Sequence, residues 1–144
     1  METAQDILDR KGHVVHSITA DDTVFEAIRR MDELHVGALL VMEGEKMVGI
    51  ITERDYARKV ILKGRASATT RVAEIMSHRV SHVKTGDTVE HCLALMTERN
   101  VRHLPVMDHG RVVGLLSMRD LVAGRRAVNE FILAQLKGAG SEAG

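Results

Sequence analysis

The sequence predicts a mixed α/β fold, of the α+β kind, made of two copies of one β-α-β-β-α unit. The main observation is an internal repeat: shifting the 144-residue chain by 65 positions aligns Val15–Tyr56 with Val80–Leu121 without a gap, and 14 of the 42 aligned positions are identical. In each copy, apolar residues at helical spacing give way to short apolar runs typical of strands. Polar, glycine-containing links separate those runs, as they do in hairpins.

The first helix of each copy is expected to begin at an Asp-Thr pair, because a threonine side chain can cap the first backbone N–H groups of a helix. These pairs are Asp22-Thr23 and Asp87-Thr88. The apolar positions that follow are Val24, Ala27, Ile28 and Met31 in the first copy and Val89, Cys92, Leu93 and Met96 in the second. The two helices are expected to end near His35 and Asn100.

A pair of strands is expected after each of these helices. Val36–Met42 and Val101–Met107 are too uniformly apolar for a strand with one face in water. The second strands are expected at Met47–Ile51 and Val112–Leu116, after the hairpin links Glu43–Lys46 and Asp108–Arg111.

A second helix then opens at Thr52-Glu-Arg-Asp55 and at Ser117-Met-Arg-Asp120, and the first of these is expected to end near Gly64. Lead-in helices are expected at Thr3–Lys11 and Arg71–Met76, and a C-terminal helix extension at Ala127–Leu136. One unit alone leaves an apolar face uncovered, so we expect the copies to pack through their sheets about a pseudo-twofold axis. The predicted domains are residues 1–64 with the first lead-in helix and residues 65–124, followed by an extension and tail at 125–144.

The composition argues against several classes of partner. Lys and Arg number 20 and Asp and Glu also 20, so neither a nucleic acid nor an acidic membrane is indicated. Aromatic residues are 2% of the chain, which leaves almost no stacking platform for single-stranded nucleic acid. No apolar stretch approaches the roughly 20 residues of a membrane span, and the first residues lack a secretory signal pattern. A cytoplasmic protein is expected.

The residue patterns of common catalytic and metal sites are also missing. The sequence has no Gly-x-Ser-x-Gly turn, no Walker-type phosphate loop and no Gly-x-Gly-x-x-Gly fingerprint, so we expect no enzyme activity. Its eight histidines form no paired metal-binding pattern, and no metal site is expected. Cys92, the single cysteine, aligns with Ala27 on an apolar helix face and is interpreted as a buried hydrophobic residue.

The repeated segments resemble a tandem pair of cystathionine-β-synthase (CBS) domains, the arrangement called a Bateman module. The resemblance rests on Val36-Gly-Ala-Leu-Leu-Val41 and Val101-Arg-His-Leu-Pro-Val106, and on Gly49-Ile-Ile-Thr-Glu-Arg-Asp55 and Gly114-Leu-Leu-Ser-Met-Arg-Asp120. It covers about Thr3 to Leu121. It implies a regulatory module that binds an adenosine-containing ligand (AMP, ADP, ATP, S-adenosylmethionine or NAD) between the repeats and often forms a dimer.

The resemblance also implies which residues form the two ligand clefts, each combining the Thr/Ser-x-x-Asp segment of one repeat with strand-edge residues of the other. One cleft would contain Ser117 and Asp120 with Val15, His16, Val36, Gly37 and Ala38. The other would contain Thr52 and Asp55 with Val80, Ser81, Val101, Arg102 and His103. Candidate phosphate partners are Arg102, His103, Arg54 and Arg119.

Physical chemistry agrees with these roles. Thr52 and Ser117 stand at helix starts, where unpaired N–H groups attract a phosphate, and one turn later Asp55 and Asp120 can accept hydrogen bonds from ribose hydroxyls. The alternative is that both aspartates only complement a helix dipole. Arg102-His103 replaces the Gly37-Ala38 of the first repeat, so the two clefts are expected to differ in affinity, and the cleft that contains Arg102-His103 is expected to suit a phosphate better.

These observations predict a non-catalytic, homodimeric sensor of energy or redox state that binds an adenine nucleotide, AMP first and NAD(H) second, and that regulates an unidentified protein. Two other classes stay open. One is a slow nucleotide hydrolase, which would need a positioned base and usually a metal. The other is a structural scaffold with degenerate clefts, favoured by Leu40 in place of Pro105 and by Gly37-Ala38.

Overall fold

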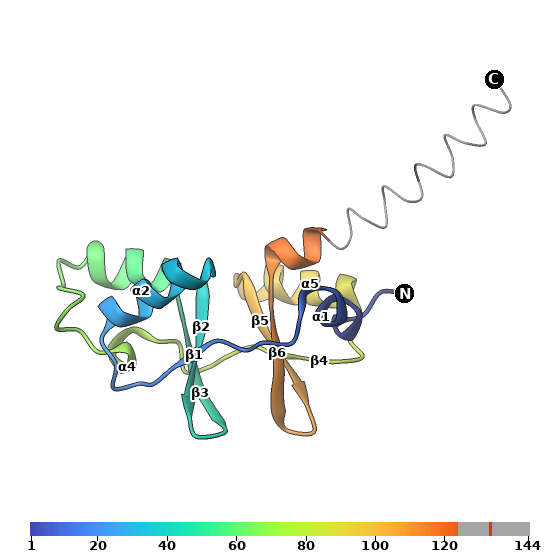
Figure 1. Cartoon of the computed structure of the whole chain (residues 1–144). Coiled ribbons are helices and arrows are strands. Elements are labelled where there is room, and N and C mark those ends of the chain that lie inside the picture. Colours follow the sequence, from blue (N-terminus) through green and yellow to red (C-terminus); the bar gives the residue numbers. More distant parts are fainter. Residues whose placement is uncertain (124–132, 134–144) are drawn as a thin grey trace, which may run out of the picture. The chain divides into compact units, whose positions relative to one another are not determined.

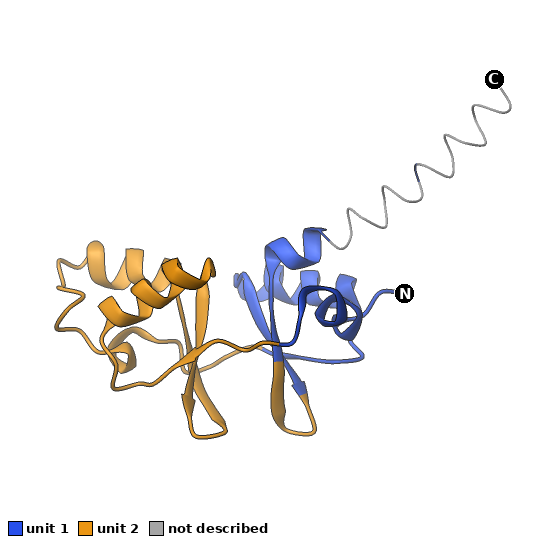
Figure 2. Ribbon diagram, viewed as in Figure 1, with its two compact units in different colours: residues 1–13, 82–107, 114–144 blue, residues 14–81, 108–113 orange. Residues whose placement is uncertain are grey.

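The computed structural model describes residues 1–123 and 133. They fall into two compact units (Figure 2). The first-repeat unit consists of residues 14–81 and 108–113, and the second-repeat unit of residues 1–13, 82–107 and the chain from 114 onward. The expected C-terminal helix extension, Ala127–Leu136, lies outside the described residues except for Leu133. The expected packing of the copies through their sheets, and the domain boundaries, stay predictions.

The first-repeat unit has a three-stranded sheet with helices beside it (Figure 1). Its elements in chain order are β1 (Ser17–Ile18), α2 (Val24–Leu34), β2 (Ala38–Glu43), β3 (Lys46–Thr52), α3 (Glu53–Tyr56), the π-helix η1 (Ala57–Ile61) and α4 (Val72–Ile75). The strand order is β1-β2-β3, with β1 parallel and β3 antiparallel to β2. This is the predicted order of strand, helix, strand, strand and helix.

The second-repeat unit repeats that plan. Its elements are α1 (Ala4–Lys11), β4 (Val83–Lys84), α5 (Val89–Arg99), β5 (His103–Asp108) and β6 (Arg111–Ser117), except for the hairpin end 108–113, which is assigned to the first-repeat unit. A last helix begins at Met118. The strand order is β4-β5-β6, and β4 runs parallel to β5. The predicted α+β fold with two copies of one unit is confirmed.

Local chemistry explains why these helices and turns form where the sequence places them. Thr23 and Thr88 are the N-caps of α2 and α5, and their side chains accept hydrogen bonds from backbone N–H groups three residues later. Both helices end at a residue in the left-handed region, His35 with φ 56° and Asn100 with φ 54°. The predicted helix limits are therefore confirmed.

The centre of each sheet is buried on both faces, as the uniformly apolar strands predict. Leu39, Leu40 and Val41 of β2 are fully buried, and so are Leu104 and Val106 of β5. The apolar side of α2, including Ala27 and Met31, is buried in one core cluster with Leu39 and Val41 of β2. The core is aliphatic, as the low aromatic content predicts.

The two lead-in helices are exchanged between the repeats. In the first-repeat unit, α4 is anchored by hydrogen bonds from Val72 N to Asp22 O (2.8 Å) and from Ala73 N to Ala20 O (3.0 Å). In the second-repeat unit, α1 is anchored in the same way, from Ala4 N to Asp87 O (2.8 Å) and from Gln5 N to Thr85 O (3.0 Å). Each helix thus covers the repeat that it does not directly precede in sequence.

Equivalent glycines give the lead-in helices room. Gly114 of β6 lies directly under Leu8 of α1, where a Cβ atom would come within 2.7 Å of Leu8 Cδ1. Gly49 of β3 lies under the end of α4, where a Cβ atom would come within 2.8 Å of Ser77 O. A side chain at either position would push the covering segment away from its strand.

Candidate functional site

The Ser117-x-x-Asp120 segment forms a reciprocal cap at the start of the last described helix. Ser117 N donates to Asp120 Oδ2 at 2.8 Å, and Asp120 N donates to Ser117 Oγ at 3.1 Å. Ser117 ends β6, so the strand and this cap together fix where the Asp120 carboxylate lies. Asp120 therefore has a structural role at the start of this helix, in addition to the helix-dipole role considered as the alternative to ligand binding.

The Thr52-x-x-Asp55 segment closes in the same way, with one more hydrogen bond. Asp55 Oδ2 accepts hydrogen bonds from both Thr52 N (3.0 Å) and Thr52 Oγ1 (3.1 Å), and Asp55 N donates to Thr52 Oγ1 at 3.1 Å. The structure defines this as a capping box of α3. The threonine hydroxyl is thus already engaged within the motif.

Each of the two aspartates is contacted by a lysine that the sequence reasoning missed. Lys11 Nζ, from the end of α1, donates to Asp120 Oδ2 and to Leu115 O, both at 2.7 Å. Lys59 Nζ, from η1, lies 3.1 Å from Asp55 Oδ1 and donates to Ile75 O at 2.8 Å. Lys59 was detectable as an i,i+4 partner of Asp55. No local signal pointed to Lys11, because 109 positions separate it from Asp120.

These contacts leave the two carboxylates unequally available. Among the described residues, both donors to the Asp120 carboxylate bind Oδ2, whereas Asp55 has contacts on both of its oxygens. The Asp120 side chain is also more exposed, at 22% against 12% for Asp55. Asp120 Oδ1 is therefore the better placed oxygen for a ligand hydroxyl.

Charges around Asp120 keep that carboxylate ionised. Partial burial raises the pKa of Asp120, but the hydrogen bonds from Lys11 and from Ser117 outweigh burial, and the pKa lies below its ordinary value of 3.8. His103 lies in the same environment. Burial lowers its pKa below 6.5, Asp120 raises it, and Lys11 and Arg102 lower it further. Near pH 7 the cluster of His103, Asp120, Lys11 and Arg102 therefore holds a neutral imidazole, one carboxylate and two cations.

The backbone brings the predicted strand-edge residues to the motif of their own repeat. Gly37 O accepts a hydrogen bond from Glu53 N at 3.0 Å, and Arg102 O accepts one from Met118 N at 2.8 Å. The first N–H group of each helix is thus already bonded, so each helix start offers a phosphate fewer donors than the sequence implies. The predicted pairing of each motif with residues of the other repeat stays a prediction.

The other predicted residues lie on loops and at helix starts. Val15 and His16 precede β1, and His16 O accepts a hydrogen bond from Leu40 N at 3.2 Å. Val80 and Ser81 lie in the loop before β4, and Val36 and Val101 lie just before β2 and β5. Ala38 begins β2 opposite Thr52. Arg54 and Arg119 occupy the first turn of their helices.

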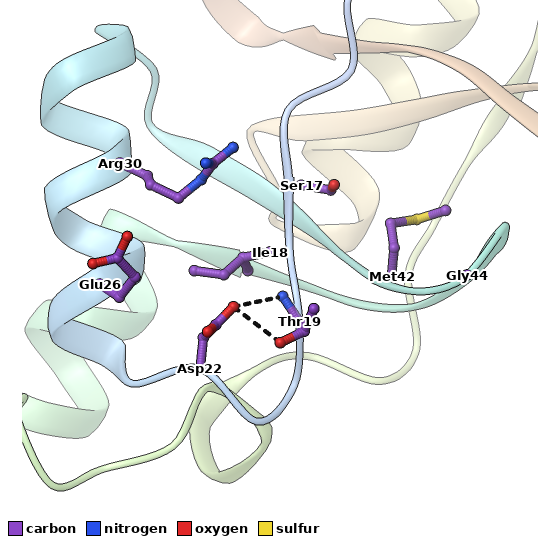
Figure 3. Close-up of a pocket in the computed structure, with 8 residues that line it drawn as sticks. All are labelled: Ser17, Ile18, Thr19, Asp22, Glu26, Arg30, Met42 and Gly44. Carbon is purple, nitrogen blue, oxygen red and sulfur yellow. Dashed lines mark hydrogen bonds between the residues drawn. The ribbon is translucent and has the colours of Figure 1, made fainter.

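A cavity of about 340 Å³ lies elsewhere, in the first-repeat unit between α2 and the β1 and β2 strands (Figure 3). It is lined by Ser17, Ile18, Thr19, Asp22, Glu26, Arg30, Met42 and Gly44, none of which was predicted as a site residue. Its acids are already partnered, because Asp22 Oδ2 accepts from Thr19 N and Oγ1 and Glu26 pairs with Arg29. Arg30 Nε is buried without a hydrogen-bond partner.

A cysteine nucleophile, a metal site and a membrane-spanning helix find little support in the described residues. Cys92 is fully buried, and burial together with the charge of Asp87 raises its pKa to about 11, so it is a poor nucleophile. Within residues 1–123 and 133, no three His, Cys, Asp or Glu side chains gather closely enough to hold a metal ion. None of the described helices combines the length and apolar content that a bilayer crossing needs.

Comparison with known proteins places these features in a family. The CBS domain model matches the chain twice, over residues 4–62 and 72–126. The CBS domain-containing protein CBSX3, mitochondrial, of Arabidopsis thaliana is 37% identical over 137 residues, which cover 89% of this chain and 66% of the relative. The chain thus spans just under two thirds of that relative's length.

Solved structures share the fold. A candidate signal-transduction protein with CBS domains from Burkholderia ambifaria MC40-6 is 46% identical with a TM-score of 0.84, over 87% of this chain and 94% of that one. The CBS domain pair of protein MJ0100 is 25% identical with a TM-score of 0.74, over 88% of this chain and 98% of that one. That pair was solved in complex with 5′-methylthioadenosine and S-adenosyl-L-methionine.

Proposed function

The chain belongs to the CBS domain family as a tandem pair of CBS domains, a regulatory module, and on that premise we propose that it senses an adenine nucleotide without catalysis. AMP is the first proposed ligand, and ADP or ATP could take the same site. The observation that carries this proposal is the Asp120 carboxylate, ionised, held by Ser117 and Lys11, and with Oδ1 facing no donor among the described residues.

A ribose suits that carboxylate chemically. Vicinal hydroxyl groups donate to a carboxylate oxygen in charge-assisted hydrogen bonds, which are stronger than bonds between neutral groups. The MJ0100 domain pair binds two ligands that contain adenosine, which supports an adenosine ligand here as well. Because Asp55 is bonded on both oxygens, we propose, against the order expected from Arg102-His103, that the Ser117–Asp120 motif binds nucleotide more tightly than the Thr52–Asp55 motif.

Signalling would follow from a shift in population. A nucleotide that contacts both repeats stabilises the relative orientation to which it binds more tightly, and only that difference in affinity can drive the change. A partner enzyme, transporter or regulator would then recognise the altered surface. We further propose that the chain acts as a homodimer in the cytoplasm. NAD(H) is the second ligand candidate, since a dinucleotide can place its second half beyond the same adenosine site.

The first experiment is mass spectrometry of the small molecules released when the purified protein is denatured, followed by calorimetric titration with AMP, ATP and NADH. Micromolar binding of AMP, weakened by about tenfold or more in Asp120→Asn, would support the proposal. Binding of NADH alone would favour the redox sensor. Binding of none of the three would favour a scaffold. Release of phosphate from ATP and Mg²⁺ by the purified chain would instead indicate a hydrolase.

A further inference from the structure

Lys11 is held at the Ser117–Asp120 motif by a helix that the sequence places far from it. Helix α1 is fixed on the second-repeat unit by its backbone hydrogen bonds to Thr85 and Asp87 and by the fully buried Leu8. Lys11 is the last residue of this helix, and its ammonium group lies 2.7 Å from both Leu115 O and Asp120 Oδ2. Two bonds to different acceptors fix the position of this cation.

The ammonium group retains a donor for a ligand. A lysine ammonium carries three N–H donors, and Leu115 and Asp120 take two of them. Lys11 keeps 36% of its side chain exposed, so solvent or a ligand reaches it. A hydroxyl group bonded to Asp120 Oδ1 would bind the same carboxylate whose other oxygen holds Lys11. A ribose there brings its own 5′ substituent into the neighbourhood of the cation.

The local charge favours an anionic substituent. The charged groups acting on His103 at this place are Asp120, Lys11 and Arg102, which sum to one positive charge. His103 adds no charge near pH 7, because its pKa is lowered. A 5′-phosphate would therefore gain Coulomb attraction and a charge-assisted hydrogen bond, whereas an uncharged 5′ group would gain neither.

We propose that Lys11 makes this site selective for adenosine ligands that carry a 5′-phosphate over those that carry an uncharged 5′ group. The inference rests on the proposed function, since it takes Asp120 as the ribose ligand. It assigns to α1 a part in ligand choice, beyond its part in covering the second repeat.

The test compares two ligands that differ at the 5′ position, AMP and 5′-methylthioadenosine, by calorimetric titration of the full chain. The wild-type chain is expected to bind AMP at least about tenfold more tightly. In Lys11→Met, AMP affinity is expected to fall by at least about tenfold while affinity for 5′-methylthioadenosine changes by less than about threefold. Lys11→Arg retains the charge and is expected to retain the preference.

Lys59→Met is the matched control, because Lys59 makes the same two kinds of contact, to an aspartate and to a backbone carbonyl, in the first repeat. It is expected to leave the preference at the Asp120 site unchanged. Thermal unfolding followed by circular dichroism establishes that each variant is folded at the titration temperature. If Lys11→Met is unfolded there, the ligand preference of Lys11→Gln, which retains hydrogen-bonding groups but loses the charge, is measured instead.

The outcomes separate this inference from the function on which it rests. Equal loss of affinity for both ligands in the lysine variants would show that Lys11 only supports the fold, and would overturn the inference alone. A wild-type preference for 5′-methylthioadenosine would also overturn it. A wild-type chain that binds neither ligand would overturn the proposed function and the inference together.

Discussion

Replacing Gly114 by alanine is expected to detach or displace α1 from the second repeat. The new Cβ atom would lie 2.7 Å from Leu8 Cδ1 and 3.1 Å from Leu8 Cγ, well inside ordinary contact distances. Leu8 is 0% exposed and cannot turn into solvent without leaving its site. The Leu8 side chain must therefore repack within the core, or the strand or the helix must move.

The size of the effect can be bounded. Overpacking a core by one methyl group costs about 1–3 kcal/mol when the surroundings adjust. If α1 instead lifts off, the chain loses the burial of Ile7 and Leu8, worth about 1.5–3 kcal/mol each. We expect Gly114→Ala to lower the free energy of unfolding by about 2–4 kcal/mol, measured by urea denaturation with the m-value compared between variants.

A double mutant tests the cause. Leu8→Ala alone is expected to cost about 2.7–5 kcal/mol, as other buried leucine truncations do. It also removes the methyl groups that meet the new Cβ, so the double variant Leu8→Ala/Gly114→Ala should cost at least about 1 kcal/mol less than the sum. At Gly49 a new Cβ would lie 2.8 Å from the backbone atom Ser77 O and 2.9 Å from Met76 Sδ. Met76→Ala removes only the second obstacle, so it should relieve Gly49→Ala only in part. A Gly114→Ala protein within about 0.5 kcal/mol of wild type, or strict additivity with Leu8→Ala, would refute this reasoning.

Further predictions concern the ionisable groups. Asp120→Asn should weaken AMP binding by about tenfold or more. Asp55→Asn should weaken it by less, because Asp55 has contacts on both oxygens. Equal losses of affinity in calorimetric titration would contradict the proposed difference between the two motifs. The pKa of His103 is lowered by folding, so the unfolded chain binds its proton more readily and stability should fall as pH drops from about 7 through 6.5 toward the folded-state pKa. His103→Gln should flatten that part of a urea-midpoint profile between pH 5 and 8. An unchanged slope would count against a half-buried, neutral imidazole. The pKa of Asp120 is also lowered. The stability that Asp120 contributes should therefore be present above pH 3.8 and lost as pH falls toward its folded-state pKa. In the same assay, Asp120→Asn should remove this loss of stability at acid pH.

Sequence reasoning predicted the features that depend on neighbouring residues. Thr23 and Thr88 cap helices because their side chains reach N–H groups three positions away, and Gly44 and Gly110 turn the hairpins with positive φ angles. The repeat itself identified the Asp55 and Asp120 motifs. All of these signals lie within a few residues of the structure that they specify.

The features that sequence reasoning missed depend on contacts between distant residues. Lys11 reaches Asp120 only because α1 packs over Gly114, and nothing in residues 1–13 indicates which sheet they cover. Lys59 is four positions from Asp55, yet whether its ammonium would point there or into solvent depends on Ile75 O at the end of α4. The selection among several possible partners is made by tertiary packing.

The exchange of lead-in helices makes the order of synthesis matter for this chain. Helix α1 is synthesised well before two residues that it contacts, Leu115 and Asp120, which lie 104 and 109 positions after Lys11. The apolar side of α1 therefore stays uncovered, and accessible to chaperones or to other chains, until nearly the whole described chain has been synthesised. Helix α4 follows the sheet that it covers and can dock as soon as it emerges. A fragment that begins at the second repeat would lack the helix that covers its sheet, so the second repeat is completed only when the whole pair is synthesised as one chain.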